Sequence, residues 1–385
     1  MAYSADCAVI GAGVIGSSIA YQLTKRGFKT ILIERLAPGQ GATRAAAGML
    51  AAECEAFVHP ELAALAMRSR NMFGELVREL EALTGLQTGY VTAGFVIPAR
   101  TPVEAERLSA LADKKDGAAV QWWDAEEISR RIPGLKGQVA GGLFREQETQ
   151  LLPQRLTRAL VAGAEKLGAE LLTGTTVHEI LTVDNRVRGV KTSGGHIVCP
   201  KVVFAGGLDE LRLLRTCGIQ LDMYPVKGEV AAVTMPARPL DYTIYAEDVY
   251  LVPKPDGELW IGATSRAHKA GADVSAGGLQ HLLTRACAWL PEIRESSFLR
   301  AWSGLRPQTR DGLPFIGPVP DVAGLYAACG HYRNGILLSA ATGEAIADFI
   351  TGLTAEQLKL MALSPERVKR PPAAVHGYAA KGGVQ

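Results

Sequence analysis

The sequence lacks the features that mark several common classes of protein. None of its six cysteines lies in a C-x-x-C pair, and the seven histidines form no H-x-x-x-H motif. Neither a zinc site of those types nor a disulfide framework is indicated, so we expect reduced thiols in a cytoplasmic protein. Basic residues number 41 and acidic residues 39, a net charge of +2. This balance excludes a generally basic nucleic-acid surface and gives no reason to expect adhesion to anionic membranes.

Long hydrophobic runs are also missing. Residues 7–24 carry no charge, but Asp6 precedes them, no basic residue stands in front, and Gly11, Gly13 and Gly16 interrupt them. This segment predicts neither a secretory signal nor a membrane span. The residue in excess is glycine, with 42 in 385 positions, about 11% against a usual ~7%. The fold is therefore expected to need many positions without a Cβ atom.

The first 34 residues have the pattern of a β-α-β unit. Residues 7–10 predict a buried strand, residues 17–26 a helix that Gly27 ends, and residues 30–33 a second buried strand. The first turn carries the motif G-x-G-x-x-G, and Glu34 closes the second strand. With strand, helix and acid in register, this unit predicts dinucleotide binding rather than an ordinary glycine-rich turn.

Each part of this unit has a physical role. The first glycine permits a tight turn, the second lets the backbone approach a pyrophosphate, and the third lets the helix pack closely on the strand. The helix N-terminus offers free N–H groups and partial positive charge to phosphates. Glu34 can accept hydrogen bonds from ribose hydroxyls and would repel a 2′-phosphate, which disfavours NADP.

A second stretch of small residues, 39–50, favours FAD over NAD because its backbone could run against a flat cofactor. A flexible linker of small residues is the alternative interpretation.

Several motifs together resemble a known family. They are the Thr43–Leu50 stretch, Ala51–Glu55, Pro225–Glu229, Tyr250–Pro253, Gly304–Pro307 with Asp311–Gly312, and Gly330–Leu338. With the first turn and Glu34, they resemble the FAD-dependent amine and amino-acid oxidases related to D-amino-acid oxidase and sarcosine oxidase. Within that family the resemblance is greatest to the glycine oxidases of thiamine biosynthesis. It extends over about residues 5–350.

The resemblance and the order of the elements predict an α/β fold. A Rossmann-like FAD-binding domain is expected to contain an inserted α+β substrate domain built on an antiparallel sheet. We assign 1–85, 151–219 and 305–363 to the FAD-binding domain, 86–150 and 220–304 to the substrate domain, and 364–385 to a C-terminal tail. Helices are expected near 62–83, 153–167, 275–290 and 336–350. Val177 is expected to end a short strand, and Trp122 and Trp123 to be packing residues of a strand.

Three residues are candidates for the catalytic site. Arg306 stands in a glycine-rich apolar setting, where a guanidinium could bind a substrate carboxylate in a bidentate pair. An ion pair with a core carboxylate is the alternative for Arg306, and plain sheet packing is the alternative for Tyr250. The resemblance implies that Arg306 and Tyr250 bind the substrate carboxylate and that Arg333 lies at the pocket edge.

The resemblance also implies the residues that bind non-covalent FAD, since no cysteine matches the position that anchors flavin in monomeric sarcosine oxidases. His331 is expected to contact the flavin through its backbone and not to act as a base. The helix that follows would stabilise negative charge on the reduced flavin. The expected cofactor-binding residues are Gly11, Gly13, Val14, Ile15, Gly16, Glu34, Arg35, Ala42, Thr43, Arg44, Ala47, Gly48, Met49, Val177, Gly206, Gly330, His331, Arg333, Asn334, Gly335, Ile336 and Leu337.

The expected activity is oxidation of glycine, sarcosine or small D-amino acids by hydride transfer to flavin N5. Oxygen would then reoxidise the flavin and give hydrogen peroxide, and the resemblance suggests a homotetramer. Two residues depart from the glycine oxidase pattern: Ser265 stands where a pocket methionine is expected, and Asp248 where a histidine is expected. A D-amino-acid dehydrogenase that passes electrons to a quinone or carrier is the alternative, and a non-catalytic flavin-binding or tRNA-modifying scaffold is a third hypothesis.

Overall fold

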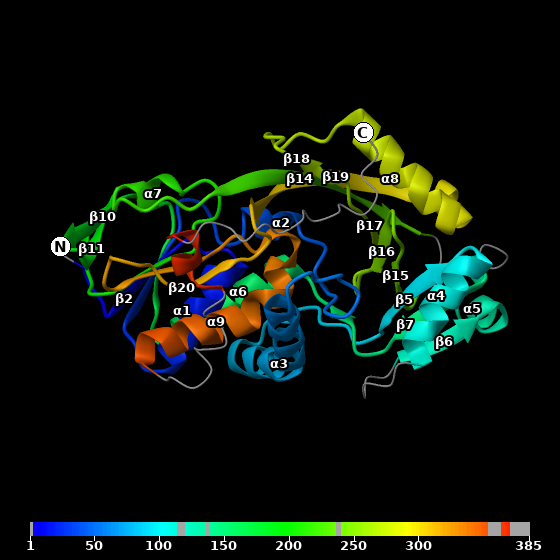
Figure 1. Ribbon diagram of the computed structural model, residues 1–385, viewed down its shortest axis with the longest axis horizontal. Helices are drawn as coiled ribbons and strands as arrows, with labels where there is room; N and C mark the ends of the chain where they lie inside the picture. The colour runs from blue at the N-terminus through cyan, green and yellow to red at the C-terminus, as the bar shows by residue number, and fades with distance from the viewer. Residues whose placement is uncertain (1–2, 114–119, 136–138, 236–239, 353–362, 370–385) are drawn as a thin grey trace.

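The computed structural model describes residues 3–113, 120–135, 139–235, 240–352 and 363–369. Figure 1 shows an elongated molecule with a six-stranded sheet and its helices at one end and a nine-stranded sheet at the other. The long strands β14 (Met223–Thr234) and β19 (Ser297–Thr309) run between these two parts. The predicted α/β fold class is confirmed.

The six-stranded sheet has the order β20-β21-β13-β2-β3-β9. All neighbouring strands are parallel except β20 and β21, which are antiparallel. The chain returns to this sheet from three separated stretches of sequence. Its strands are β2 (Cys7–Ile10), β3 (Thr30–Ile33), β9 (Glu170–Leu172), β13 (Val202–Phe204), β20 (Phe315–Pro318) and β21 (Leu325–Cys329).

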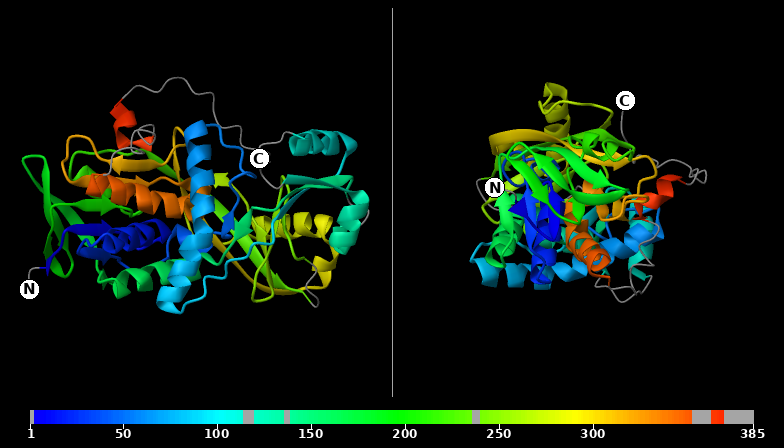
Figure 2. Two further views of the ribbon diagram at one scale, coloured as in Figure 1. Left: turned by 90° about the horizontal axis from the view of Figure 1, so that it is seen from below. Right: turned by 90° about the vertical axis from the view of Figure 1, so that its left-hand side faces the viewer.

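Both faces of this sheet are buried, which explains why its strands are continuous apolar runs. Cys7 and Val9 pack in the core beneath the helices, whereas Ala8 and Ile10 pack toward a four-stranded sheet. Figure 2 shows the helices and the small sheet on opposite sides. The helices are α1 (Val14–Lys25), α3 (Pro60–Thr84), α6 (Pro153–Lys166) and α9 (Gly335–Thr351). The small sheet contains β1 (Tyr3–Ser4), β10 (Val177–Val183), β11 (Arg186–Thr192) and β12 (Gly195–Val198), and α7 (Arg212–Arg215) lies beside it.

The nine-stranded sheet has the order β18-β14-β17-β16-β15-β5-β7-β6, with β19 paired to β14. Its neighbours are antiparallel except β5 and β15, which are parallel, so the expected antiparallel sheet has one exception. The remaining strands are β5 (Phe95–Ala99), β6 (Val120–Asp124), β7 (Gly141–Arg145), β15 (Thr243–Tyr245), β16 (Tyr250–Pro253), β17 (Glu258–Gly262) and β18 (Arg266–Ala267). The helices beside it are α4 (Pro102–Asp113), α5 (Ala125–Arg131) and α8 (Ala276–Trp289).

Packing explains the tryptophan pair on β6. Trp123 is buried and stacks on Phe144 with ring centroids 4.2 Å apart. The prediction of a packing role is confirmed for this residue.

Three boundaries differ from expectation. The first helix begins at Val14, three residues before Ser17, because the motif's own residues already form its first turn. Val177 begins strand β10 rather than ending a strand. The first residues of the predicted tail form a 3-10 helix, η5 (Pro365–Lys369), in which Arg367 donates to Asp311 at 2.6 Å. The rest of that tail, 370–385, lies outside the described residues.

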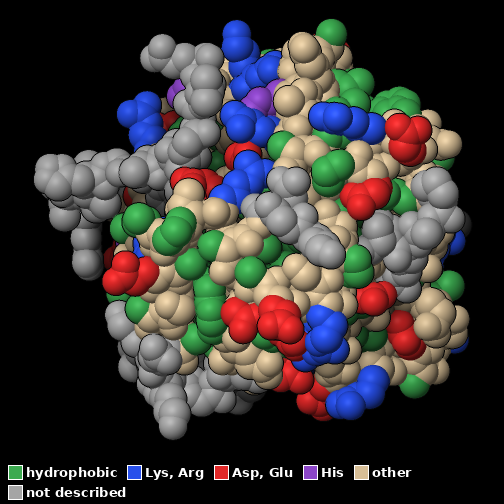
Figure 3. Space-filling view, turned by 90° about the vertical axis from the view of Figure 1, so that its right-hand side faces the viewer, with side chains coloured by type: hydrophobic (Ala, Val, Ile, Leu, Met, Phe, Trp, Pro, Cys, Tyr) green, Lys and Arg blue, Asp and Glu red, His purple; other side chains and the backbone are tan. Residues whose placement is uncertain are grey.

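The outer surface of the nine-stranded end carries both signs of charge. Figure 3 shows basic and acidic side chains in small mixed groups on this face, with no large area of one sign. Within the described parts of the chain, every helix is too short or too polar to cross a membrane.

Candidate functional site

One cavity is lined by segments from both the six-stranded and the nine-stranded part of the molecule. Its lining includes the turn after β2, the 40–49 stretch, residues 205–207, Tyr250, the 304–307 stretch of β19 and residues 328–336. These segments are far apart in the sequence. The predicted cofactor segments and the predicted catalytic residues are thus brought to one place.

The turn after β2 needs its glycines. Gly11 has a φ of +97°, and a Cβ on it would lie 2.8 Å from the Ala205 carbonyl oxygen. A Cβ on Gly16 would lie 1.9 Å from the Gly11 carbonyl oxygen. Gly13 is different, since a Cβ there would meet only Thr43 Oγ1, at 3.5 Å. The turn therefore requires glycine at positions 11 and 16, while Gly13 leaves space in the cavity beside its backbone.

Glu34 and Thr43 fix this turn as well as lining the cavity. Glu34 Oε2 accepts a hydrogen bond from the Ala12 amide at 2.8 Å, and Thr43 Oγ1 accepts one from the Val14 amide at 3.1 Å. Arg35, also at the cavity, pairs with Asp209. The sequence predicted Glu34, Arg35 and Thr43 only as cofactor-binding residues, and their contacts with the protein were not predicted.

A second helix also starts at the cavity. Helix α9 follows the 3-10 turn η3 (Tyr332–Asn334), and its N-terminus has no side-chain cap and no acidic residue in the first turn. Helix α1 has the same two properties at Gly13. Both helices therefore present backbone N–H groups and partial positive charge to the cavity.

The His331 side chain is buried, and its imidazole is in contact with another side chain of the protein. Its Nε2 lies 3.1 Å from Thr342 Oγ1, and burial lowers the pKa of His331 to about 3. An imidazole held in this way contributes no charge near neutral pH. A pKa this low makes the ring a weak base, and its contact with the flavin through its backbone stays a prediction.

Arg306 occupies the cavity without an acidic partner. Its Nη1 donates to the Thr264 carbonyl at 3.1 Å, and no carboxylate among the described residues lies within ion-pair distance of it. A Cβ on Gly228 would come within 2.3 Å of the guanidinium, so the glycine makes room for it. The alternative interpretation of Arg306 as half of an internal ion pair is not supported.

Tyr250 is placed in the same way. It lies opposite Gly262 on β17, where a Cβ would come within 2.5 Å of the hydroxyl. Burial raises the pKa of Tyr250, although the nearby Arg306 opposes the shift. The hydroxyl is therefore a neutral proton donor at the cavity. Both side chains lie over glycines of neighbouring strands.

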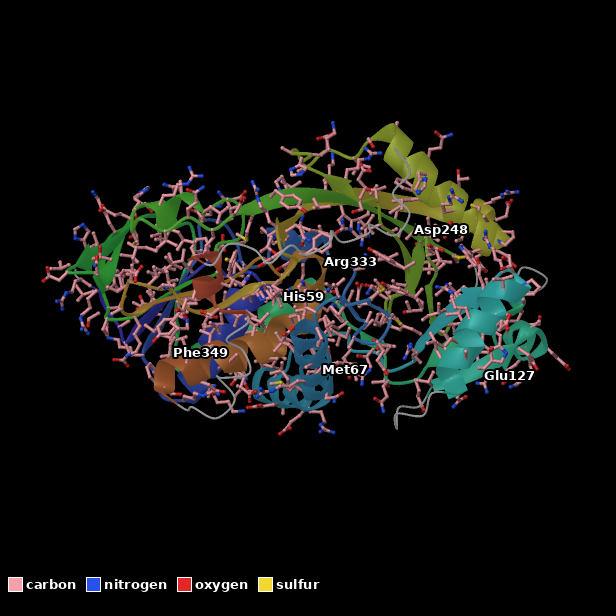
Figure 4. The ribbon with its side chains drawn as sticks, viewed as in Figure 1. His59, Met67, Glu127, Asp248, Arg333 and Phe349 are labelled. Atoms are coloured by element: carbon pink, nitrogen blue, oxygen red, sulfur yellow. The ribbon has the colours of Figure 1, made fainter. Side chains whose placement is uncertain are left out.

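Arg333 is already paired. Its Nη2 lies 3.1 Å from Glu55 Oε1 and donates to the Tyr245 hydroxyl at 3.2 Å, while Tyr245 donates to Glu55 at 2.8 Å. Glu55 is the main cause that raises the pKa of Arg333. Figure 4 labels Arg333 near the middle of the molecule, between the two sheets. Sequence reasoning assigned no role to Glu55 or Tyr245, although Glu55 stands in a stretch that matches the resembling family.

A buried carboxylate supports Arg306 from behind. Glu229 on β14 is fully buried, and its Oε2 accepts a hydrogen bond from Thr264 Oγ1 at 3.0 Å. The Glu229 amide donates back to Thr264 Oγ1 at 2.9 Å, and the Ser275 amide donates to Glu229 Oε1 at 2.8 Å. Thr264 is therefore held on two sides, and its carbonyl orients Arg306.

Some predicted residues do not reach the cavity. Gly16, Arg44 and Leu337 are not among the residues that line it. Leu337 is packed in the helical core, and the Arg44 side chain is exposed. All other residues predicted for the cofactor or for catalysis line the cavity.

The two departures from the family pattern lie away from the cavity wall. Asp248 accepts a hydrogen bond from Trp289 Nε1 at 3.1 Å and pairs with Arg285 at 3.4 Å, both on α8. Figure 4 shows Asp248 beside that helix. Ser265 is exposed and does not line the cavity. The cavity lining therefore gives no sign that Ser265 or Asp248 changes the size or polarity of the wall.

Comparison with known proteins places this cavity in context. A family profile described as FAD dependent oxidoreductase matches residues 6–349. The chain is 38% identical to a glycine oxidase of Geobacillus kaustophilus, over 91% of this chain and 94% of that one. It is 37% identical to a bifunctional protein ThiO/ThiG of Trichormus variabilis, over 90% of this chain and 52% of that one. The crystal structure of glycine oxidase from Geobacillus kaustophilus superposes with a TM-score of 0.88, at 37% identity over 94% of this chain and 98% of that chain.

Proposed function

The chain belongs to the FAD-dependent oxidoreductase family, and from this premise we propose that it oxidises glycine and other small amino acids or amines. The observation that carries the substrate class is Arg306, a guanidinium in the cavity wall with no acidic partner among the described residues. A partly buried guanidinium without an acidic partner is suited to bind an anion, and a substrate carboxylate matches its fork of donors. The names of the relatives support glycine as that substrate.

The cavity fits FAD. Two helix N-termini without side-chain caps face it, which suits the pyrophosphate at α1 and the electron-rich pyrimidine edge of the flavin at α9. Glu34 would accept from the ribose hydroxyls, and Ala47, Gly48 and Met49 would lie along the flavin. When bound, FAD would supply the redox chemistry by accepting the hydride from the substrate Cα atom, that is, one hydrogen nucleus with both electrons of the Cα–H bond.

The protein's share of the reaction is binding and orientation. Arg306 and Tyr250 would hold the carboxylate, so that the Cα–H bond of a substrate with a neutral amine faces the flavin. Burial lowers the pKa of His331 to about 3, which makes its imidazole a poor proton acceptor, and its Nε2 lies in hydrogen-bond contact with Thr342 Oγ1, so no side-chain base is assigned. The imine product hydrolyses to 2-oxo acid and ammonia, and oxygen is the proposed electron acceptor, giving hydrogen peroxide.

The flavin is proposed to bind without a covalent bond. Cys329 lines the cavity, but burial raises the pKa of its thiol to about 12, so it is not a thiolate near neutral pH. A flavin that stays with the protein through acid precipitation would contradict this assignment.

The substrate site is tested by Arg306→Ala. Leaving the carboxylate without its charged partner should lower kcat/KM for glycine, by an amount that corresponds to about 2–4 kcal/mol of transition-state stabilisation. Arg300→Ala is the matched control, because Arg300 lies on the same strand but forms an exposed pair with Glu258. Near-normal activity of Arg306→Ala with glycine would overturn the proposed site.

The oxidase and dehydrogenase hypotheses differ in their electron acceptor. An oxygen electrode should record oxygen uptake with glycine, whereas a D-amino-acid dehydrogenase would turn over only with an artificial acceptor. A flavin that no amine bleaches would favour the non-catalytic hypothesis. A cytoplasmic location, a homotetramer and a supply of product to thiazole synthesis belong to the same proposal. The free thiols support the first, and the resemblance to a protein named ThiO/ThiG supports the last.

A further inference from the structure

Lys254 is a buried lysine that the proposed reaction does not use. It follows strand β16, and only 1% of its surface is exposed. Its Nζ donates to the Ala47 carbonyl at 2.6 Å, to Gln150 Oε1 at 2.7 Å and to the Leu151 carbonyl at 3.1 Å. These three acceptors use all three donors of an ammonium group.

The contacts favour the charged form of this side chain. Burial lowers the pKa of Lys254 to about 7, and Asp256 and Glu258 oppose the shift from a distance. A neutral amine has two donors and a lone pair, so one of the three oxygens would face that lone pair. The arrangement of three acceptors therefore fits the ammonium.

The positive charge has no acidic partner in contact. Glu258 pairs with Arg300, Asp256 lies 3.9 Å from Arg155, and no carboxylate among the described residues lies within ion-pair distance of Lys254 Nζ. The Trp260 ring, whose centroid is 4.6 Å from Nζ, is its other neighbour. A buried charge without a counter-ion lowers the stability of the fold. We therefore infer that Lys254 has a role other than stabilising the fold.

Two of the three acceptors belong to the wall of the cavity or to its immediate support. Ala47 lines the cavity next to Gly48, whose φ is +81° and whose Cβ would lie 2.0 Å from the Leu151 carbonyl oxygen. The Leu151 amide donates to the Gly48 carbonyl at 2.9 Å. Lys254, at the end of strand β16, thus links that strand to the cavity wall at 47–49 and to Leu151.

The third acceptor extends this tie. Gln150 lies on β8 (Thr149–Gln150), which pairs with β4 (Met49–Leu50), and its Nε2 donates to the Pro253 carbonyl at 2.5 Å. Strand β16 of the nine-stranded sheet is therefore joined to the 47–50 segment through both Gln150 and Lys254.

We propose that Lys254 is a positioning residue of the flavin site, which holds the Ala47–Met49 wall in place and sets a fixed positive charge behind it. The proposal rests on the flavin site described under the proposed function and not on which amine is oxidised. A fixed cation near the cofactor favours its reduced, more negative form. Loss of Lys254 should weaken FAD binding and make the reduction potential of the bound flavin more negative.

The test compares Lys254→Met with the wild-type holoenzyme. The dissociation constant of FAD should rise by at least roughly tenfold, the effect of losing one strong charge-assisted hydrogen bond. The reduction potential should shift to more negative values. Lys166→Met is the matched control, because Lys166 also donates to a carbonyl, that of Leu83, but on the outer surface. Unchanged FAD affinity and unchanged potential in Lys254→Met would overturn the proposal.

Gln150→Glu provides a test that does not remove the lysine. A carboxylate at this position would neutralise the ammonium and keep an acceptor for it, although it loses the hydrogen bond that Gln150 Nε2 donates to the Pro253 carbonyl. The flavin potential should then become more negative, and FAD affinity should fall less than in Lys254→Met, because the lysine still holds the Ala47 and Leu151 carbonyls. A potential equal to that of the wild type would contradict the fixed-charge part of the proposal.

Gly13→Ala separates this proposal from the flavin site itself. The added Cβ is compatible with the backbone at φ −70° and meets no protein atom closer than 3.5 Å, so the chain should still fold. It should nevertheless obstruct a pyrophosphate. If Gly13→Ala weakens FAD binding and Lys254→Met does not, only the role of Lys254 fails. If neither does, the flavin site fails.

Discussion

The two sheets build opposite sides of one cavity by different means. The six-stranded sheet contributes mainly backbone: the glycine turn after β2, the 328–331 stretch at the end of β21 and the first residues of α1 and α9. The nine-stranded sheet contributes side chains, above all Arg306 and Tyr250, each lying over a glycine of a neighbouring strand. The first side depends on positions without a side chain, and the second depends on particular side chains.

This difference predicts how each side responds to substitution. Where a Cβ would clash with backbone, as at Gly11 and Gly16, a substitution should act as an all-or-none loss. A side-chain surface is held by hydrogen bonds, so the effect of a change there should grow with the number of hydrogen bonds that the substitution removes.

The largest effect is expected at Gly16. A Cβ in Gly16→Ala would lie 1.9 Å from the Gly11 carbonyl oxygen, so the turn must move and helix α1 with it. We expect loss of FAD binding and a destabilisation of at least about 3 kcal/mol, measured by flavin content and chemical unfolding. Gly74→Ala is the control, since a Cβ at that helical position meets nothing within 4 Å and should stabilise the protein by about 0.5–1 kcal/mol. A Gly16→Ala protein with full flavin content would contradict the backbone account.

A smaller effect is expected at Glu229, behind Arg306. Glu229→Gln keeps an acceptor for Thr264 but removes the charge, so Arg306 should lose part of its orientation. We expect a loss in kcat/KM of about 1–2 kcal/mol, less than for Arg306→Ala. The loss should appear mainly in KM and in the affinity for glycolate, which has the carboxylate of glycine but a hydroxyl in place of the amine. The flavin difference spectrum measures that affinity. A loss confined to kcat, with glycolate affinity unchanged, would argue against a role through Arg306.

The next effect is expected at Tyr250. Tyr250→Phe removes one neutral hydroxyl and leaves the ring over Gly262, so the cost should be about 1 kcal/mol in kcat/KM. Steady-state kinetics with glycine measure it. A loss as large as that of Arg306→Ala would show that the two residues act as a unit rather than as separate contacts.

The smallest effect is expected at Asp248. Because Asp248 contacts Trp289 and Arg285 on α8, Asp248→Asn should leave kcat/KM for glycine within about twofold of the wild type. Kinetics over several small amines provide the check. A changed amine preference would restore the view that Asp248 bears on the cavity wall.

The features that sequence predicted are local or carry a fixed spacing. The glycine turn, the strands around it and Glu34 lie within 34 residues, and their order alone determines their contacts. The contacts that sequence missed join distant positions with no shared pattern. Glu229 meets Thr264 only because β14 pairs with β17. Lys254 stands between two prolines before a turn, a position typical of an exposed residue, yet it is buried beneath Ala47. Leu337 continues a matching motif, but the helix directs it into the core.

The most direct test of the central claim is anaerobic bleaching of the flavin by glycine and by methylamine, which lacks the carboxylate. If Arg306 anchors the substrate, glycine should bleach the visible absorbance of FAD and methylamine at the same concentration should not, with a difference of at least roughly thirtyfold in the rate constant of reduction at low substrate. Equal bleaching by the two amines, or bleaching by neither, would contradict the account.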